Sequence, residues 1–310
     1  MRMVFMGTPD FALCSLRALV ETGETVIGAV TQPDKPRGRG YVLTPPPVKV
    51  YATEQGIPVY QPQSLRNGAF DAELRELAPD LIVVVAYGKI LPAEVLSFPK
   101  YGAMNVHGSL LPAYRGAAPM QRVLIDGEAE TGVTIMQMDV GLDTGDMLLV
   151  KRLPIGENDN FEDIHDGLGA LGATAMLETL ALLREGKLVP VKQDDALANY
   201  AAKIEKSDCL IDFTASAKSV HDRIRGLSPI PLAFTHTPDG KMLKVIESRI
   251  GGAASAGALP GTVVALTDRI TVACGEGAIS LLSVLPEGKG RMTAAAYING
   301  RRLSLGDRLQ

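Results

Sequence analysis

The chain has 310 residues, more than one compact core usually holds and enough for two domains. Hydrophobic residues make up 46% of it and charged residues 21%, a balance that excludes a largely disordered protein. The net charge is −4, yet residues 1–207 carry 19 Lys and Arg against 26 Asp and Glu, whereas residues 208–310 carry 12 against 9. This asymmetry fits either separate tasks for two domains or simple scatter.

The sequence predicts neither export nor membrane insertion. The N-terminal segment lacks the uninterrupted apolar stretch of a signal peptide, and the longest apolar run, Leu81–Tyr87, has only the length of a strand. Three dispersed cysteines, Cys14, Cys209 and Cys274, suit a reducing compartment and lack the spacing of zinc ligands. We therefore expect a soluble, cytoplasmic protein with no metal site and no membrane partner. These observations do not determine the oligomeric state, for which we expect a monomer.

Strand and helix signals alternate through the first half of the chain, which is the pattern of a parallel sheet covered by helices. The predicted strands are Met3–Met6, Thr25–Thr31, Pro58–Gln61, Asp80–Tyr87 and Ala103–Val106. The predicted helices are Asp10–Val20, Val48–Gln55, Asp71–Leu77, Pro92–Leu96 and Pro119–Asp126. The segment Asp34–Lys49, dense in Pro, Gly and basic residues, is predicted to be an exposed loop.

Two further strands and a long helix complete this part of the chain. Thr131–Met138 and Met147–Leu153 form a predicted strand pair, and Phe161–Arg184 is predicted as an amphipathic helix interrupted by glycines. We therefore predict a Rossmann-like α/β domain with a mostly parallel sheet over residues 1–189. A polar, irregular linker follows over residues 190–207.

The pattern changes beyond the linker. A predicted helix, Ser216–Gly226, precedes five short strands that are separated by Gly, Pro and Asp turns, and a last helix is predicted at Thr293–Ile298. The strands are Leu232–Thr237, Met242–Ile250, Thr262–Leu266, Ile270–Cys274 and Ile279–Val284. Short strands in this succession favour a small closed or nearly closed barrel. We predict an OB-like β-barrel domain over residues 208–310.

Polar residues gather at the end of the predicted strand Ala103–Val106. Residues two apart in a strand point to the same face, so Asn105 and His107 project together at the carboxyl edge of the sheet, where open parallel sheets bind ligands. The amide can hold a carbonyl oxygen as it becomes an oxyanion, while the imidazole stabilises that charge or delivers a proton. A solvated histidine beside a turn-forming asparagine fits these residues too, so both interpretations stand at this point.

The loop Asp139–Asp146 carries three carboxylates among glycines. It lacks the glutamate that closes an EF-hand, and plain turn chemistry explains such aspartates. A carboxylate delivered to an imidazole would, however, fix the tautomer of the ring and support its protonated form. Elsewhere, the turn Gly7–Asp10 lacks the glycines of a dinucleotide fingerprint and no phosphate-loop motif occurs, which disfavours an NAD or ATP enzyme.

Two runs of sequence carry a family resemblance. NVHGSLLPAYRGAAP (Asn105–Pro119) and GVTIMQMDVGLDTGDM (Gly132–Met147) resemble the 10-formyltetrahydrofolate-dependent formyltransferases, whose active site combines Asn-x-His, an SLLP segment and a later Asp. Asp143 stands 36 residues after His107, at the spacing of that family. The resemblance implies that Asn105, His107 and Asp143 are catalytic and that 10-formyltetrahydrofolate is the co-substrate.

The same resemblance implies a set of folate-binding residues. Part of the folate site is contributed by Ser109, Leu110, Leu111 and Pro112. The pterin pocket is expected to be lined by Val85, Tyr87, Ile90 and Leu91.

Further motifs, among them TQPDKPRGRG and RGAAPMQR, are similar to the family members that formylate initiator methionyl-tRNA for translation initiation. They imply tRNA contacts from Lys35, Arg37, Arg39 and Lys49, with Arg39 at the acceptor end. The C-terminal barrel, which has a net positive charge, would bind the tRNA through contacts with its phosphates. Two alternatives stay open: a folate-dependent formyltransferase for a small amine, such as a purine ribonucleotide or an amino sugar, and a non-catalytic tRNA- or folate-binding protein.

Overall fold

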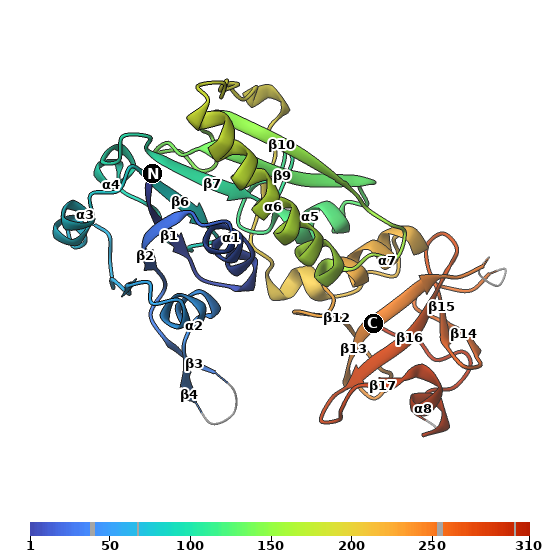
Figure 1. Ribbon diagram of the computed structural model, residues 1–310. Helices are drawn as coiled ribbons and strands as arrows, with labels where there is room; N and C mark the ends of the chain where they lie inside the picture. Colours follow the sequence, from blue (N-terminus) through green and yellow to red (C-terminus); the bar gives the residue numbers. More distant parts are fainter. Residues whose placement is uncertain (38–40, 67, 253–256, 301) are drawn as a thin grey trace. The chain divides into compact units, whose positions relative to one another are not determined.

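The structure, a computed structural model, describes residues 1–37, 41–66, 68–252, 257–300 and 302–310 (Figure 1). The chain divides into two compact units. Unit 1 comprises Met1–Gly116, Thr131–Leu153 and His165–Tyr200, and unit 2 comprises Ala117–Glu130, Pro154–Ile164 and Ala201–Gln310. Unit 2 thus takes in two stretches that lie within residues 1–189, the predicted first domain. The domain boundaries drawn from the sequence at residues 189 and 207 stay a prediction.

Unit 1 is built on a seven-stranded sheet in the order β10-β9-β7-β6-β1-β2-β5. Its strands are β1 (Arg2–Gly7), β2 (Thr25–Val30), β5 (Val59–Tyr60), β6 (Leu81–Val85), β7 (Ala103–His107), β9 (Glu130–Gln137) and β10 (Met147–Pro154). The pairs β5-β2, β2-β1, β1-β6 and β6-β7 are parallel, and β7-β9 is antiparallel. The chain leaves β1 for β2 on one side and later returns to β6 on the other, so a ligand crevice is expected at the carboxyl ends of β1, β6 and β7.

Helices cover both faces of this sheet, as the alternating pattern predicts. They are α1 (Asp10–Glu21), α2 (Pro47–Glu54), α3 (Asp71–Leu77), α4 (Ala93–Ser97) and α6 (Phe161–Arg184). Figure 1 shows α6 running across the strands. It is long and apolar enough to cross a membrane, but Leu168, Met176 and Leu180 are buried, as in the core helix of a globular domain.

The glycines of α6 do not interrupt it. A Cβ at Gly172 would lie 2.7 Å from Val106 Cγ1, and one at Gly169 would lie 3.0 Å from Cys14 Sγ. These positions therefore let the helix approach β7 and α1 closely, which outweighs the low helix propensity of glycine.

The predicted loop Asp34–Lys49 contains a small hairpin. Its strands are β3 (Lys35–Arg37) and β4 (Val42–Thr44), which pair antiparallel, and Figure 1 shows the hairpin extending away from the sheet of unit 1. The remaining short elements of this unit and its boundary are β8 (Arg115–Gly116), a 3-10 helix at Asp195–Leu197 and β11 (Tyr200–Ala201).

Unit 2 contains an antiparallel sheet in the order β12-β13-β16-β15-β14, with β17 beside β16. Its elements are α5 (Pro119–Ile125), a 3-10 helix at Lys206–Cys209, α7 (Ala217–Gly226), β12 (Ala233–His236), β13 (Met242–Ile250), β14 (Val263–Leu266), β15 (Ile270–Ala273), β16 (Ala278–Pro286), β17 (Met292–Thr293) and α8 (Ala294–Asn299). The predicted Rossmann-like domain with a mostly parallel sheet is thereby confirmed, and so is a C-terminal part built on short antiparallel strands.

The sheet of unit 2 is not closed by a direct pairing of its edge strands within the described residues. The last residues of the chain bond to both edges instead. Leu309 donates to the Gly261 carbonyl at 2.9 Å, just before β14, and Gln310 exchanges two backbone hydrogen bonds with His236 of β12. The predicted barrel is therefore an open sheet whose edges are connected through this C-terminal segment.

Polar side chains of α7 are buried inside unit 2. Arg225, 6% exposed, donates to the carbonyls of Gly156 at 3.3 Å and Asp159 at 3.0 Å. His221, 2% exposed, donates from Nε2 to the Glu157 carbonyl at 3.1 Å. These bonds tie the stretch before α6 to α7 and account for its inclusion in unit 2.

The core of unit 1 holds an unsatisfied phenol that yields a stability prediction. Tyr87 is 2% exposed, and its hydroxyl finds no hydrogen-bond partner within the part of the chain described. We expect Tyr87→Phe to stabilise the protein by about 1 kcal/mol at pH 7, since a buried unsatisfied hydroxyl costs ~1–3 kcal/mol. Urea unfolding measures this, with Tyr60→Phe as the control from the same core.

The pH dependence of the same variant gives a second readout. Burial raises the pKa of Tyr87 to about 12, whereas an unfolded tyrosine ionises near pH ~10. Between these values the unfolded chain loses the proton first, so Tyr87 makes the native protein less stable as pH rises. The advantage of Tyr87→Phe should grow there by up to roughly 3 kcal/mol. A Tyr87→Phe variant that is less stable than the parent both at pH 7 and in this alkaline range would contradict the cost assigned to the buried hydroxyl.

Candidate active site

Strand β7 places Asn105 and His107 on one face of the sheet. Val106, between them, packs against Gly172 of α6, so its two neighbours point away from that helix. His107 is 6% exposed. The Asn105 side chain is partly exposed and makes no hydrogen bond to any described residue, which leaves its amide available to a ligand.

Hydrogen bonding fixes the tautomer of His107. Its Nε2 lies 3.0 Å from the carbonyl oxygen of Tyr114, and a carbonyl only accepts, so Nε2 carries a hydrogen. The other ring nitrogen, Nδ1, lies 3.7 Å from Asp143 Oδ2. Nδ1 is therefore the nitrogen that gains and loses a proton, and a carboxylate faces it.

Asp143 reaches His107 from the loop between β9 and β10. Its φ of +54° lies in the left-handed region, which is unusual for a residue other than glycine and is typical of strained functional loops. Its Oδ2 accepts a hydrogen bond from the Gly116 amide at 2.9 Å. Asp139, by contrast, accepts from the Thr144 hydroxyl and the Gly141 amide within the loop, so it acts as a turn former.

Thr134 is a supporting residue that the sequence did not reveal. It lies opposite His107 in the β7-β9 ladder and is completely buried. Its hydroxyl donates to the Ser109 carbonyl at 2.8 Å and accepts from the Leu111 amide at 3.1 Å. The turn that follows His107 is thereby tied to the neighbouring strand, a contact that only strand pairing makes visible.

The four residues after Gly108 that the family resemblance assigns to folate have different surroundings. Ser109 is 1% exposed and donates to the Ala113 carbonyl at 2.7 Å. Leu111 is buried, Pro112 is partly exposed, and Leu110 packs against Gly132 of β9. The hydroxyl of Ser109 is thus occupied within the protein, whereas Leu110 and Pro112 are partly exposed.

In the proposed pterin segment, Val85, Tyr87 and Leu91 are buried and Ile90 is 75% exposed. The turn between β6 and α4 has positive φ at Ala86 (44°) and Gly88 (79°). Loops after β1 and β2 support it. Thr8 Oγ1 and Gln32 Nε2 each donate to the Tyr87 carbonyl at 3.1 Å. The loops at the carboxyl ends of β1, β2 and β6 are thereby joined.

The basic residues assigned to tRNA fall into three groups. Lys35 is exposed in β3, and Arg37 lies at the end of that strand. Arg39 lies outside the described residues. Lys49 Nζ bonds to both carboxylate oxygens of Asp34 at 2.8 and 2.9 Å and to Gln61 Oε1 at 2.8 Å.

The Lys49 cluster anchors the base of the hairpin. The Lys49 ammonium, with a smaller contribution from Gln61, holds the pKa of the Asp34 carboxyl below its usual value. All three hydrogens of the ammonium have acceptors, so its present contacts favour a structural task over phosphate binding. Across the described parts of the chain, no group of three or more His, Cys, Asp or Glu side chains is arranged to hold a metal ion.

Replacing Thr134 tests the support of the turn after His107. We expect Thr134→Val to lose about 1–3 kcal/mol of stability, because a buried amide and a buried carbonyl lose their partner. Thr134→Ser keeps the hydroxyl and should lose less, by the transfer of one methyl group, about 1 kcal/mol. Chemical unfolding of both variants is the measurement, and equal losses would contradict the role of the hydroxyl.

Comparison with known proteins agrees with this arrangement of motifs. The formyl transferase family model matches residues 1–180, and the model of the formyl transferase C-terminal domain matches residues 203–302. The chain is 50% identical over 307 residues to the methionyl-tRNA formyltransferase of Citrifermentans bemidjiense, covering 99% of this chain and 95% of the other. It is 50% identical over 310 residues to that of Geotalea daltonii, covering 100% and 98%.

Solved structures share the fold at lower identity. The N-formyltransferase of Helicobacter canadensis, in complex with folinic acid and dTDP-3-aminofucose, matches with a TM-score of 0.67 and 19% identity over 90% of this chain and 98% of its own. HypX of Aquifex aeolicus, in complex with tetrahydrofolic acid, matches with a TM-score of 0.64 and 18% identity over 98% of this chain and 48% of its own. With both family models matched in order, this chain belongs to the formyl transferase family, among relatives that are methionyl-tRNA formyltransferases.

Proposed function

We propose that this protein transfers the formyl group of 10-formyltetrahydrofolate to the α-amine of methionine on initiator tRNA, for translation initiation. The observation that carries the proposal is the His107–Asp143 pair, with one ring nitrogen fixed by Tyr114 and the other facing a carboxylate. Identity of about 50% over the full chain to methionyl-tRNA formyltransferases supports the choice of acceptor.

The reaction needs two things from the protein. The amine attacks the formyl carbon, forms a tetrahedral oxyanion and gives up one proton. The intermediate collapses as N10 of the folate leaves and takes up a proton in return. The oxyanion needs a hydrogen-bond donor, and the Asn105 amide has no competing partner among the described residues. The leaving nitrogen needs a proton, and Nδ1 of His107 is the ring position from which a proton can move.

The separation between His107 and Asp143 suits this exchange. At 3.7 Å, the Nδ1 to Oδ2 distance is longer than a direct hydrogen bond, so a bridging water or reacting group can share the proton. In this proposal Asn105 and His107 act on the reacting atoms, and Asp143 supports the charge that develops on His107.

For the folate, we propose that the turn Ser109–Pro112 and the segment Val85–Leu91 form the pterin site. Because several side chains and the Ser109 carbonyl and Leu111 amide are already bonded, we propose that the remaining backbone amides and carbonyls of these segments meet the amide-like edge of a pterin. Ala86 and Gly88, the two residues with positive φ in that segment, are both exposed.

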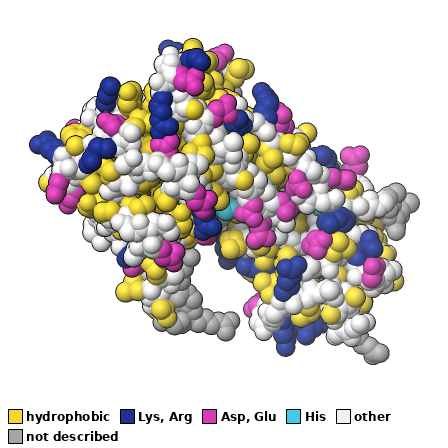
Figure 2. Space-filling model, viewed as in Figure 1, with side chains coloured by type: hydrophobic (Ala, Val, Ile, Leu, Met, Phe, Trp, Pro, Cys, Tyr) yellow, Lys and Arg dark blue, Asp and Glu magenta, His cyan; other side chains and the backbone are white. Residues whose placement is uncertain are grey.

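For the tRNA, we propose contacts from the β3–β4 hairpin and from unit 2. Lys35 is exposed on the hairpin, and Figure 2 shows Lys and Arg side chains spread over the visible face of the C-terminal strands. Several cations of unit 2 already have acidic partners, for example Lys241 with Asp239 and Lys218 with Asp222. Phosphate binding there would have to use cations outside such pairs or exchange the partners.

A small amine acceptor is the second candidate. Structural relatives include sugar N-formyltransferases and glycinamide ribonucleotide transformylase, at 18–22% identity, which is a likeness of fold alone. We further propose a cytoplasmic monomer, since three free cysteines suit a reducing compartment and the pair His107–Asp143 is completed within one chain.

The catalytic proposal is tested with purified protein, 10-formyltetrahydrofolate and methionyl initiator tRNA in single-turnover assays. We expect Asn105→Ala to slow transfer ~10²–10³-fold through the loss of an oxyanion donor, and His107→Asn to slow it at least ~10²-fold through the loss of the proton donor. Asp143→Asn should also slow transfer. If the parent protein formylates a nucleotide sugar or a ribonucleotide amine but not the charged tRNA, the small amine is the acceptor and the tRNA proposal is wrong. Normal rates in all three variants would remove the assigned site.

The hairpin proposal is tested by the salt dependence of tRNA binding. We expect Lys35→Ala to weaken binding and to reduce the slope of log affinity against log salt by about one unit, because one phosphate contact is lost. Lys100→Ala removes an exposed cation elsewhere in unit 1 and serves as the control. Identical slopes for the two variants would remove Lys35 from the interface.

A further inference from the structure

The segment after α6 returns to the loop that carries Asp143. Val191 and Met147 exchange two backbone hydrogen bonds of 2.8 Å, which places residues 191–195 beside the end of that loop. This stretch belongs to the linker predicted from the sequence, and its composition indicates no functional site. Its position, however, brings Gln193 against the loop backbone.

Gln193 uses its whole side-chain amide there. Nε2 donates to the Asp143 carbonyl at 2.9 Å and to the Gly145 carbonyl at 2.7 Å. Oε1 accepts from Arg115 Nε at 3.0 Å, and the residue is only 6% exposed. A buried amide with both donor hydrogens placed on one loop holds that loop in a single geometry.

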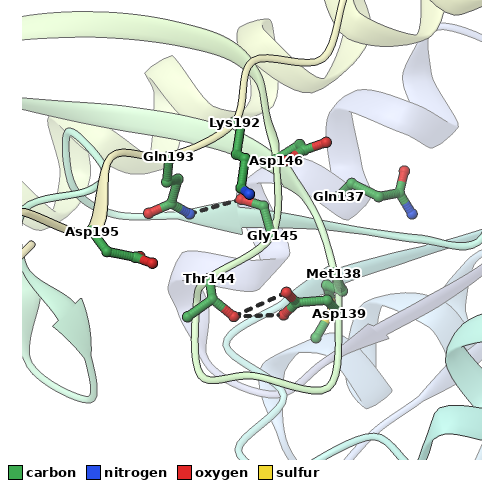
Figure 3. A pocket seen from close by; sticks show the side chains of 9 residues that line it. All are labelled: Gln137, Met138, Asp139, Thr144, Gly145, Asp146, Lys192, Gln193 and Asp195. Atoms are coloured by element: carbon green, nitrogen blue, oxygen red, sulfur yellow. Dashed lines mark hydrogen bonds between the residues drawn. The ribbon is translucent and has the colours of Figure 1, made fainter.

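The loop depends on hydrogen bonds because one side of it is not packed. An open cavity of about 410 Å³ borders Thr144, Gly145 and Gln193, and Figure 3 shows the Gln193 side chain reaching toward Gly145 at its edge. Asp143 holds a left-handed backbone, which a free loop would leave. The loop therefore needs an external restraint to keep Asp143 near His107.

Three consecutive residues, Tyr114, Arg115 and Gly116, contact His107, Gln193 and Asp143. Arg115 orients Gln193, the Gly116 amide bonds to the Asp143 carboxylate, and the Tyr114 carbonyl accepts from His107. Asp143 is thus held by its carboxylate through Gly116 and by its main chain through Gln193. A small rotation of the loop would change the Nδ1 to Oδ2 distance directly.

We propose that Gln193 is a positioning residue for the transfer reaction, which sets Asp143 opposite His107 through the loop backbone. This inference rests on the proposed function of that pair. Glutamine has the required chemistry because it offers two hydrogens to carbonyls and an oxygen to an arginine from one planar group. Glutamate in its place would direct a carboxylate at two carbonyl oxygens and repel the loop.

The test combines Gln193→Glu with Asp143→Asn in a double-mutant cycle. Gln193→Glu should lower kcat ~10–100-fold, as loss of support for a catalytic group does, while KM for folate and tRNA changes much less. In the Asp143→Asn background the same substitution should change kcat less than ~3-fold, since there is no carboxylate left to position. Gln193→Met, which keeps the length of the side chain, should behave like Gln193→Glu. It also keeps the test valid if the glutamate variant fails to fold.

Lys192→Ala is the matched control. Lys192 is the exposed neighbour of Gln193, and its change should leave kcat at the parent value. Full kcat in both Gln193 variants, with Asp143→Asn slow, would overturn the positioning role and leave the proposed function intact. An equal loss in both backgrounds would overturn it too, because that is the behaviour of a general structural residue. A fast Asp143→Asn enzyme would instead remove the role proposed for Asp143 and this inference with it.

Discussion

The hydrogen bond from Nε2 of His107 to the Tyr114 carbonyl is the interaction on which the site depends. It fixes the ring, decides which nitrogen can exchange a proton, and leaves that nitrogen facing Asp143. Tyr114 can serve this way because the turn after His107 folds back on itself, through Ser109 and Thr134. The Tyr114 carbonyl thus fixes the orientation of the imidazole ring at the end of β7.

Buried polar groups perform a similar task elsewhere in the chain. In unit 1, the Tyr87 carbonyl collects hydrogen bonds from Thr8 and Gln32, and thereby joins three loops at the carboxyl edge of the sheet. In unit 2, Arg225 and His221 of α7 satisfy the carbonyls of the stretch that precedes α6. In each case side chains bond to main-chain groups outside the helices and strands and thereby tie irregular segments to other parts of the chain.

Much of the fold could be predicted from the sequence, because local patterns determine it. The apolar run of β6, the capped helix α7 and the five short strands of unit 2 lie within a few residues of their predicted positions. Periodicity and turn residues suffice for such elements. The β3–β4 hairpin was missed because Pro and Gly mark its surroundings as a loop. The sequence predicted a closed or nearly closed barrel, and it could not decide between the two. Within the described residues β12 and β14 do not pair, and the C-terminal segment that bonds to both edges has no strand pattern.

For the candidate site, the sequence by itself determined that Asn105 and His107 share a face, since alternation in a strand is a local property. Family motifs added Asp143, but only the tertiary structure decided what surrounds these groups. Thr134 and Gln193 come from a partner strand and from a segment far along the chain, and nothing near them in sequence marks either one. Side-chain alternation is set by neighbouring residues, whereas hydrogen bonds to a loop backbone are set by which distant segments the fold brings into contact.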